Sequence, residues 1–298
     1  MKNKSTYIPE KMFFKGKMSK VATYIILSFW ALTTIAPLLW VLLNSFKNND
    51  EIISNALGLP QMYLKTGNLF TNFESLGRFS DNNIFRGFMN SFIISGSALF
   101  GILLLSSMAA FVLARFKFRF TKQVTAYLVA SMLIPQFAVI VPNFVIMREI
   151  AKVIPNFQGS YMTVIIPHVA AFCNFAILML TSFMKTIPAE LEEAAIIDGC
   201  SIPGIFVKII TPLSIPAFVS VGIMVFLWSY NDLITPLVYL TKVNLPVTVL
   251  ISQVQGLYST DYGAMMAAVT ITVVPVLLLY VFSQEYVIKG LTAGAVKG

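Results

Sequence analysis

Residues 190–199 form a polar island between two strongly apolar blocks, with the sequence Glu190-Leu191-Glu192-Glu193-Ala194-Ala195-Ile196-Ile197-Asp198-Gly199. Four of the 13 acidic residues of the chain fall within this stretch. The flanking blocks carry almost no charge. Such a cluster is typical either of a solvated loop or of a surface on which another protein docks, and the surrounding sequence bears on that choice.

The composition places the chain in a membrane. Of its 298 residues, 57% are hydrophobic and only 11% are charged, and the mean hydropathy is +0.79. Soluble domains carry about 25% charged residues, so we expect an all-α integral membrane protein. The net charge of +8 does not indicate nucleic-acid binding, because the lysines and arginines are spread over the loops between apolar runs. Positive loops of this kind set the orientation of a membrane protein.

Six apolar runs are long enough to cross a bilayer as helices of roughly 20 residues. Pro135 and Pro142 predict kinks in the third run, since neighbouring helices can satisfy the carbonyls that a proline frees. Lys and Arg are more frequent in the segments that share a side with the N-terminus, which predicts that both termini are cytoplasmic. The expected spans are 21–43, 84–114, 124–147, 160–184, 211–233 and 264–287, with an N-terminal segment 1–20, a loop 188–211 and a tail 288–298.

The loop 188–211 predicts two short helices joined by a glycine turn. Pro188 and the acids after it suit the first turn of a helix. Gly199 suits the left-handed residue that ends a helix, and Ser201 can cap a second helix that breaks at Pro212.

The first of these helices has two adjoining faces by the i, i+3, i+4 rule. Its alanines leave a flat patch that another protein can approach, with carboxylates beside it to pair with Arg or Lys. A solvated loop that merely links two spans is the alternative. The two faces comprise Leu191, Ala194, Ala195 and Asp198, and then Glu190, Glu193 and Ile197.

Polar residues within the spans are candidates for a solute pathway, because such side chains usually face the interior of a bundle. They can contact a passing sugar or hydrogen-bond between helices. The motif Trp228-Ser229-Tyr230-Asn231-Asp232 combines aromatic and hydrogen-bonding groups, although aromatic anchoring at a membrane surface also explains it. The candidates are Gln136, Asn143, Asn174, Trp228, Tyr230 and Asn231.

Other functional classes find little support. His168 is the only histidine and is expected to bond a neighbouring backbone group. Cys173 and Cys200 have no CxxC spacing, so we expect no metal site, no disulfide framework, no cofactor and no catalytic residue. A secondary transporter requires inverted repeats and an intramembrane ion site, and neither is recognisable. A membrane-embedded enzyme requires a nucleophile with a base, or a metal cluster, within the spans.

The polar island resembles the EAA loop of ABC-importer permeases. The matching residues are Glu193-Ala194-Ala195, Asp198-Gly199, Ile209-Ile210-Thr211-Pro212 and Pro216, with Thr211 standing where the family usually has leucine. Further matches extend the resemblance to carbohydrate permeases of the MalG type, over essentially the whole chain. These are Asn44-Ser45-Phe46-Lys47 with Glu51-Ile52, the Trp228 motif and the ending 290–298.

The resemblance implies the permease fold of type I ABC importers and a role as half of an alternating-access pathway for an oligosaccharide or related sugar. A permease for a polyol, glycerol phosphate or amino-sugar derivative is the alternative. The implied partners are a MalF-like second permease, a homodimeric or heterodimeric ABC ATPase and an extracytoplasmic solute-binding protein. The resemblance also implies that this chain lies in the lipid bilayer of the bacterial cytoplasmic membrane. The chain has no GxxxxGK[ST] phosphate loop, so ATP hydrolysis must come from another polypeptide.

The resemblance also assigns residues to contacts with the ATPase. The coupling residues would be Glu190, Glu193, Ala194, Ala195, Asp198 and Gly199. The tail 292–298 would reach between the ATPase subunits, with Thr292, Ala293, Gly294 and Ala295 as its contacts.

Overall fold

The computed structural model describes residues 17–61, 64, 67–76, 84–253 and 261–295. Within these residues the chain is almost entirely helical and has no strand, only an isolated bridge between Gly159 and Leu240. Four helices contain segments long and apolar enough to cross a membrane, and two bent helix pairs bring the possible spans to six. The four segments are Lys20–Asn44, Ile84–Arg115, Met162–Met184 and Tyr262–Phe282.

The chain divides into two compact units. Unit 1 comprises residues 1–73 and 262–270, with helices α1 (Lys17–Asn44) and α2 (Asn49–Ser54). Unit 2 comprises residues 74–261 and 271–298. The short helix α4 (Thr71–Ser75) and the long helix α15 (Tyr262–Ala295) run across the division in the sequence.

In unit 1, the segment after α1 folds around the buried Lys47. Its Nζ donates hydrogen bonds to the carbonyls of Asn55 and Ala56, at 3.1 and 2.9 Å. Burial lowers the pKa of Lys47, and the carboxylate of Glu51 opposes that shift. The Asn72 amide donates to the carbonyls of Ser45 and Lys47, each at 2.8 Å. The polar residues of this motif therefore hold their own loop together.

The core of unit 2 consists of α5 (Ile84–Arg115), α8 (Met162–Met184) and α12 (Ile215–Asn231). Small residues bring these helices close together. A Cβ on Gly101 of α5 would lie 3.2 Å from Val169 of α8, and one on Gly222 of α12 would lie 3.4 Å from Leu99. In lipid, where apolar surface alone does not drive helix association, such close approach supplies the packing energy.

The third expected span is two helices rather than one kinked helix. Helices α6 (Thr121–Ser131) and α7 (Gln136–Val153) meet at an angle of 100°. Pro135 explains the break, because it disfavours helical geometry at the preceding residue; its own backbone is extended, with ψ of 133°. Pro142, also expected to kink the span, lies inside α7.

The fifth expected span breaks at a different place from the one expected. The segment Ile202–Leu213 continues past Pro212 as α10 (Ile202–Ile205), a π-helical turn (Phe206–Ile210) and α11 (Thr211–Leu213). It then meets α12 at 74°, with the bend at Ser214. Pro212 occupies the first turn of α11, where its missing N–H costs little, so the expected break at Pro212 is wrong.

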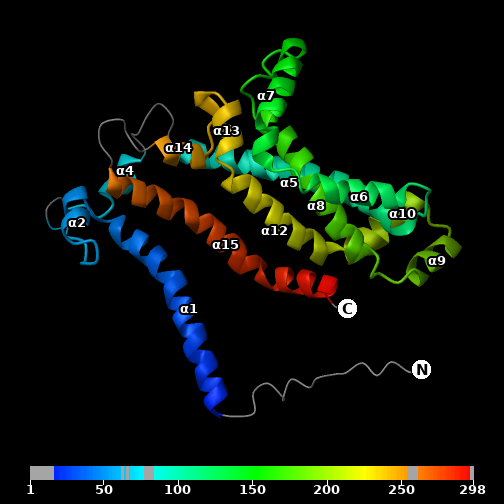
Figure 1. Cartoon of the computed structure of the whole chain (residues 1–298), viewed down its shortest axis with the longest axis horizontal. Coiled ribbons are helices and arrows are strands. Elements are labelled where there is room, and N and C mark those ends of the chain that lie inside the picture. The colour runs from blue at the N-terminus through cyan, green and yellow to red at the C-terminus, as the bar shows by residue number, and fades with distance from the viewer. Residues whose placement is uncertain (1–16, 62–63, 65–66, 77–83, 254–260, 296–298) are drawn as a thin grey trace. The chain divides into compact units, whose positions relative to one another are not determined.

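Helices α5 and α8 both run from the end of unit 2 that carries α13 (Ile234–Tyr239) and α14 (Val247–Gln253) toward the end that carries α9 (Glu190–Ile197) and α10 (Figure 1). Buried polar groups tie the starts of α5 and α8 together. The Asn90 amide donates to the carbonyl of Leu245 at 2.9 Å and accepts a 2.6 Å bond from the Tyr161 hydroxyl. Ser91 accepts from the backbone N–H of Val247 at 3.0 Å.

Replacing Asn90 with leucine, which has a similar volume, leaves the Leu245 carbonyl and the Tyr161 hydroxyl without their partner. Each buried group left unsatisfied costs about 1–3 kcal/mol. We expect Asn90→Leu to lower the thermal unfolding midpoint of the detergent-solubilised protein by several degrees. Tyr161→Phe removes only one hydroxyl and should have the smaller effect. Equal stability of Asn90→Leu and the unsubstituted protein would contradict the role of this network.

Candidate functional site

The polar island forms a hairpin of two short helices. Helix α9 (Glu190–Ile197) is closed by Gly199, two residues after its last helical residue. The φ of Gly199 is +81°, the left-handed conformation expected from the sequence. The N–H of Cys200 donates to the carbonyl of Ala195 at 2.8 Å, and the N–H of Gly199 donates to the carbonyl of Ile196 at 3.0 Å. This pattern is a Schellman motif. Ser201 then caps α10 by accepting from the N–H of Gly204, also as expected.

The hairpin exposes both charge and apolar surface. Ile197 is 85% and Ile196 59% exposed. Isolated apolar side chains on a surface are ordinary, whereas large contiguous apolar patches occur at interaction sites, so the hairpin is a candidate docking surface. The acidic residues Glu190, Glu193 and Asp198 are exposed with them, as are Ala194 and Gly199.

Ala195 corrects the expected flat alanine patch. Its side chain is only 8% exposed and belongs to the hydrophobic core of unit 2. Adjacent residues on a helix point about a quarter turn apart, so one alanine faces outward while the next packs inward. Ala194 therefore stays available for docking, whereas Ala195 anchors α9 to the helices beneath it.

Arg115 holds the hairpin against the end of α5. Its guanidinium forms an ion pair with Glu192, and both side chains are largely buried, at 13% and 14% exposure. The same guanidinium donates a 3.0 Å hydrogen bond to the carbonyl of Ile187. The connection between α8 and α9 is therefore fixed to α5 by charge-assisted bonds, which are roughly twice as strong as neutral ones.

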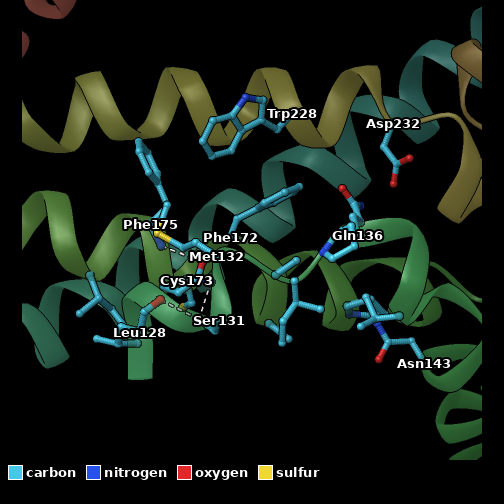
Figure 2. Close-up of a pocket in the computed structure, with 18 of the residues that line it drawn as sticks. Leu128, Ser131, Met132, Gln136, Asn143, Phe172, Cys173, Phe175, Trp228 and Asp232 are labelled. Atoms are coloured by element: carbon cyan, nitrogen blue, oxygen red, sulfur yellow. Dashed lines mark hydrogen bonds between the residues drawn. The ribbon is translucent and has the colours of Figure 1, made fainter. Parts of the chain in front are cut away.

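A cavity of about 860 Å³ lies where α6, α7, α8 and α12 approach one another. Of the six candidate pathway residues, five line it. In Figure 2, Trp228 and Asp232 project toward Phe172 and Gln136 on the opposite wall. The five are Gln136, Asn143, Asn174, Trp228 and Asn231.

One wall of the cavity is aromatic. The ring of Trp228 packs against Phe172 and Phe175, with centroids 5.5 and 4.8 Å away. Trp228 remains 39% exposed, so one part of the indole is free to contact a bound molecule. A partly exposed indole held by two other rings is a rigid platform for the apolar face of a sugar ring.

The polar groups of the cavity fall into two kinds. Asn174 is used within the protein, because its amide donates to the Ser131 hydroxyl at 2.9 Å and its oxygen accepts from the N–H of Phe175. Gln136, Asn143 and Asn231 have side chains that make no hydrogen bond to any residue the structure describes. These three amides are available to a solute.

Tyr230 does not face the cavity, which corrects its place among the candidates. It is 1% exposed and stacks on Phe226, with ring centroids 5.7 Å apart, and it also contacts Phe92 of α5. Trp228 and Tyr230 are two positions apart on α12 and so point to opposite sides of the helix. Tyr230 therefore supports the packing of α12 on α5.

His168 bonds side chains rather than the backbone group expected from the sequence. Its Nδ1 lies 2.8 Å from the Ser229 hydroxyl and its Nε2 lies 2.8 Å from an Asp232 oxygen. The other Asp232 oxygen accepts from the N–H groups of Ile234 and Thr235, at 3.0 and 3.3 Å. This cluster joins α8 to the end of α12 and to the start of α13.

The backbone of the expected ATPase-contacting tail continues α15 through Ala295. The side chains of Thr292, Ala293, Gly294 and Ala295 and the whole of residues 296–298 lie outside what the structure describes. Among the described residues, no group of three or more His, Cys, Asp or Glu could hold a metal ion.

The family model for binding-protein-dependent transport system inner membrane components matches residues 102–293, which include the hairpin and the cavity. The chain belongs to this family. It is therefore a multi-pass membrane component of a transport system rather than an enzyme.

Individual relatives extend the match to nearly the full length. The diacetylchitobiose uptake system permease protein NgcG of Streptomyces coelicolor is 32% identical, over 91% of this chain and 87% of its own. The sulfoquinovosyl glycerol transport system permease protein SmoH of Agrobacterium fabrum is 30% identical, over 96% of each chain. A solved bacterial ABC transporter for the import of alginate contains a chain with the same fold, with a TM-score of 0.74, 17% identity and coverage of 92% and 98%.

Sequence reasoning missed three features of this permease. In the sequence, Arg115 is one of many loop charges, and Asp232 is one residue of the Trp228 motif. Phe172 and Phe175 were indistinguishable from other apolar residues of their span. The spacing of Phe172 and Phe175 from His168, at i+4 and i+7, was a usable signal that all three share one face of α8.

The Arg115–Glu192 pair gives a direct test of hairpin anchoring. Arg115→Met leaves a buried carboxylate without its partner, which costs about 3–5 kcal/mol. We expect faster protease cleavage within 188–211 and a lower unfolding midpoint. Arg119→Met, at an exposed position of the same loop, is the matched control. Adding Glu192→Met to Arg115→Met should restore part of the lost stability, and strictly additive losses would contradict a direct pair.

Proposed function

We propose that this permease is one of two membrane subunits of an ATP-driven importer for an oligosaccharide or related sugar, of the MalG type. The single observation that carries the proposal is the cavity, which is lined by a held indole and by three amides that have no partner among the described residues. Sugars present apolar ring faces and hydroxyl edges, and this cavity offers a complementary group for each. The related NgcG and SmoH proteins are named for sugar-containing solutes.

The proposed mechanism is alternating access driven through the hairpin. A cleft in the ATPase receives the exposed surface of α9, comprising Glu190, Glu193, Ala194, Asp198 and Gly199. Closure of the ATPase displaces α9, and Arg115 passes the displacement to α5 while the chain itself passes it to α8. Nucleotide and solute shift the equilibrium between the inward-open and outward-open states only through their different affinities for the two states.

The proposal includes an orientation and partners. The hairpin, both termini and the ATPase lie on the cytoplasmic side, in line with the distribution of Lys and Arg. A MalF-like permease completes the pathway, and an extracytoplasmic binding protein delivers the solute to the end that carries α13 and α14. The tail, with Thr292 to Ala295, contacts the ATPase subunits. An importer for a polyol, glycerol phosphate or amino-sugar derivative is the second candidate, since free amides also bind hydroxyl groups without a ring.

Charge reversal on the hairpin tests ATPase docking. Glu193→Lys places a cation where the proposal requires an exposed carboxylate, and we expect it to abolish solute-stimulated ATP hydrolysis by the assembled complex. Glu149→Lys is the matched control, because Glu149 is also exposed but lies on α7. Expression and unfolding of the isolated permease should stay unchanged in both variants. Normal solute-stimulated ATP hydrolysis by the Glu193→Lys complex would contradict the docking role.

Truncation of the aromatic wall tests the cavity. Trp228→Ala removes the platform, and a stacking contribution of about 1 kcal/mol predicts roughly fivefold slower uptake of the stimulating sugar into vesicles. Basal ATP hydrolysis should change little. Trp228→Phe keeps an aromatic face and should retain most of the uptake. If Trp228→Ala transported as fast as the unsubstituted complex, the cavity would have to be excluded as the sugar site.

A further inference from the structure

A single charged residue, Asp232, lines the cavity among the residues that the structure describes. The rest of the lining is apolar, aromatic, hydroxyl-bearing or amide-bearing, and it contains neither lysine nor arginine. Walls of low dielectric concentrate the field of a charge that they enclose. Asp232 is therefore the charge that this chain's described residues present to a solute in the cavity.

Both oxygens of the Asp232 carboxyl group face hydrogen-bonding groups of the protein. Oδ2 faces His168 Nε2 at 2.8 Å, and Oδ1 accepts from two backbone N–H groups. Hydrogen-bond donors on both oxygens favour a carboxylate over the neutral acid. Figure 2 shows the side chain directed from the end of α12 toward the cavity.

His168 supplies this support without cancelling the charge. A neutral imidazole has one donor and one acceptor nitrogen. With the proton on Nε2, the ring donates to Asp232, while Nδ1 accepts from the Ser229 hydroxyl at 2.8 Å. Both nitrogens and the hydroxyl are then satisfied within a site where His168 is 1% exposed. With a neutral imidazole, the one net charge of the cluster is that of the Asp232 carboxylate.

We propose that Asp232 is a charge filter, which excludes anionic solutes from the cavity and admits neutral or cationic ones. This inference rests on the proposed function and narrows its substrate class to uncharged sugars and amino sugars. It removes sugar acids and sugar phosphates, and glycerol phosphate from the second candidate. His168 is a positioning residue, because it acts on the solute only through the Asp232 carboxylate.

The filter can be measured with thiol reagents of opposite charge, without knowing the solute. A Gln136→Cys, Cys173→Ser variant of the full complex carries a single thiol on the cavity lining. Trimethylammonioethyl and sulfonatoethyl methanethiosulfonate each form a disulfide with a thiolate and release methanesulfinate. Peptide mass spectrometry gives both rates at position 136. The native Cys200 of the hairpin serves as the internal control.

We expect the cationic reagent to be favoured at position 136 by about fivefold or more, relative to the ratio for a small thiol in solution. Asp232→Asn should bring that ratio close to the solution value and leave the ratio at Cys200 unchanged, while Asp232→Glu should preserve the preference. With Asp232 intact, high salt should bring the ratio of the cationic to the anionic rate at position 136 closer to the solution value, because salt screens the carboxylate. This measurement does not depend on the folding of any Asp232 variant. The filter is overturned by a ratio at the solution value with Asp232 present, or by an unchanged ratio in Asp232→Asn.

A second measurement separates this inference from the proposed function. Stimulation of ATP hydrolysis by neutral oligosaccharides is measured with the unsubstituted complex, because Gln136 is one of the amides assigned to the sugar. Absent stimulation with a charge-dependent rate ratio would overturn the sugar importer and leave the filter intact. Stimulated ATP hydrolysis together with a reagent ratio at the solution value would overturn the filter and leave the sugar importer intact.

Discussion

The close, parallel packing of α5 against α8 is the constraint on which the rest of unit 2 depends. Lipid gives no hydrophobic drive for helix association, so the contact must rest on small residues and on polar bonds. Gly101 supplies the close approach, opposite Val169. Asn90 with Tyr161 fastens one end, and Arg115 with the Ile187 carbonyl fastens the other. The hairpin and the cavity are thereby held at fixed positions on one frame.

The two bent helix pairs place non-helical backbone at the cavity and beside the hairpin. Non-helical backbone at membrane depth is tolerated where it lines a cavity or is buried in protein. The break between α6 and α7 is of this kind, because Ile134, Pro135 and Gln136 all line the cavity. The bend at Ser214 joins the hairpin to α12. Helices α8 and α12 each run from a cavity wall toward the hairpin. The proposed mechanism uses both connections, one through residues 185–189 and one through the bend at Ser214.

The cavity separates polar groups that build the protein from those that remain free. Asn174, Ser131, His168 and Ser229 are committed to bonds between helices. Gln136, Asn143 and Asn231 have no such commitment among the described residues. Asp232 has both roles, since its oxygens hold His168 and the start of α13 while its charge faces the cavity. One short motif, Trp228 to Asp232, thus holds residues that pack between helices and residues that line the cavity.

The amino-acid sequence by itself determined the membrane class, the apolar runs and the hairpin, including the left-handed Gly199 and the cap at Ser201. These features are local, because they depend on hydropathy or on residues within one helical turn. Only the tertiary structure decided that Ala195 and Tyr230 point inward, that Arg115 pairs with Glu192 and that His168 meets Asp232. Almost every face of a helix in such a chain is apolar, so periodicity does not mark the buried side. Neighbouring helices select that side, and with it the residues left to face the solute.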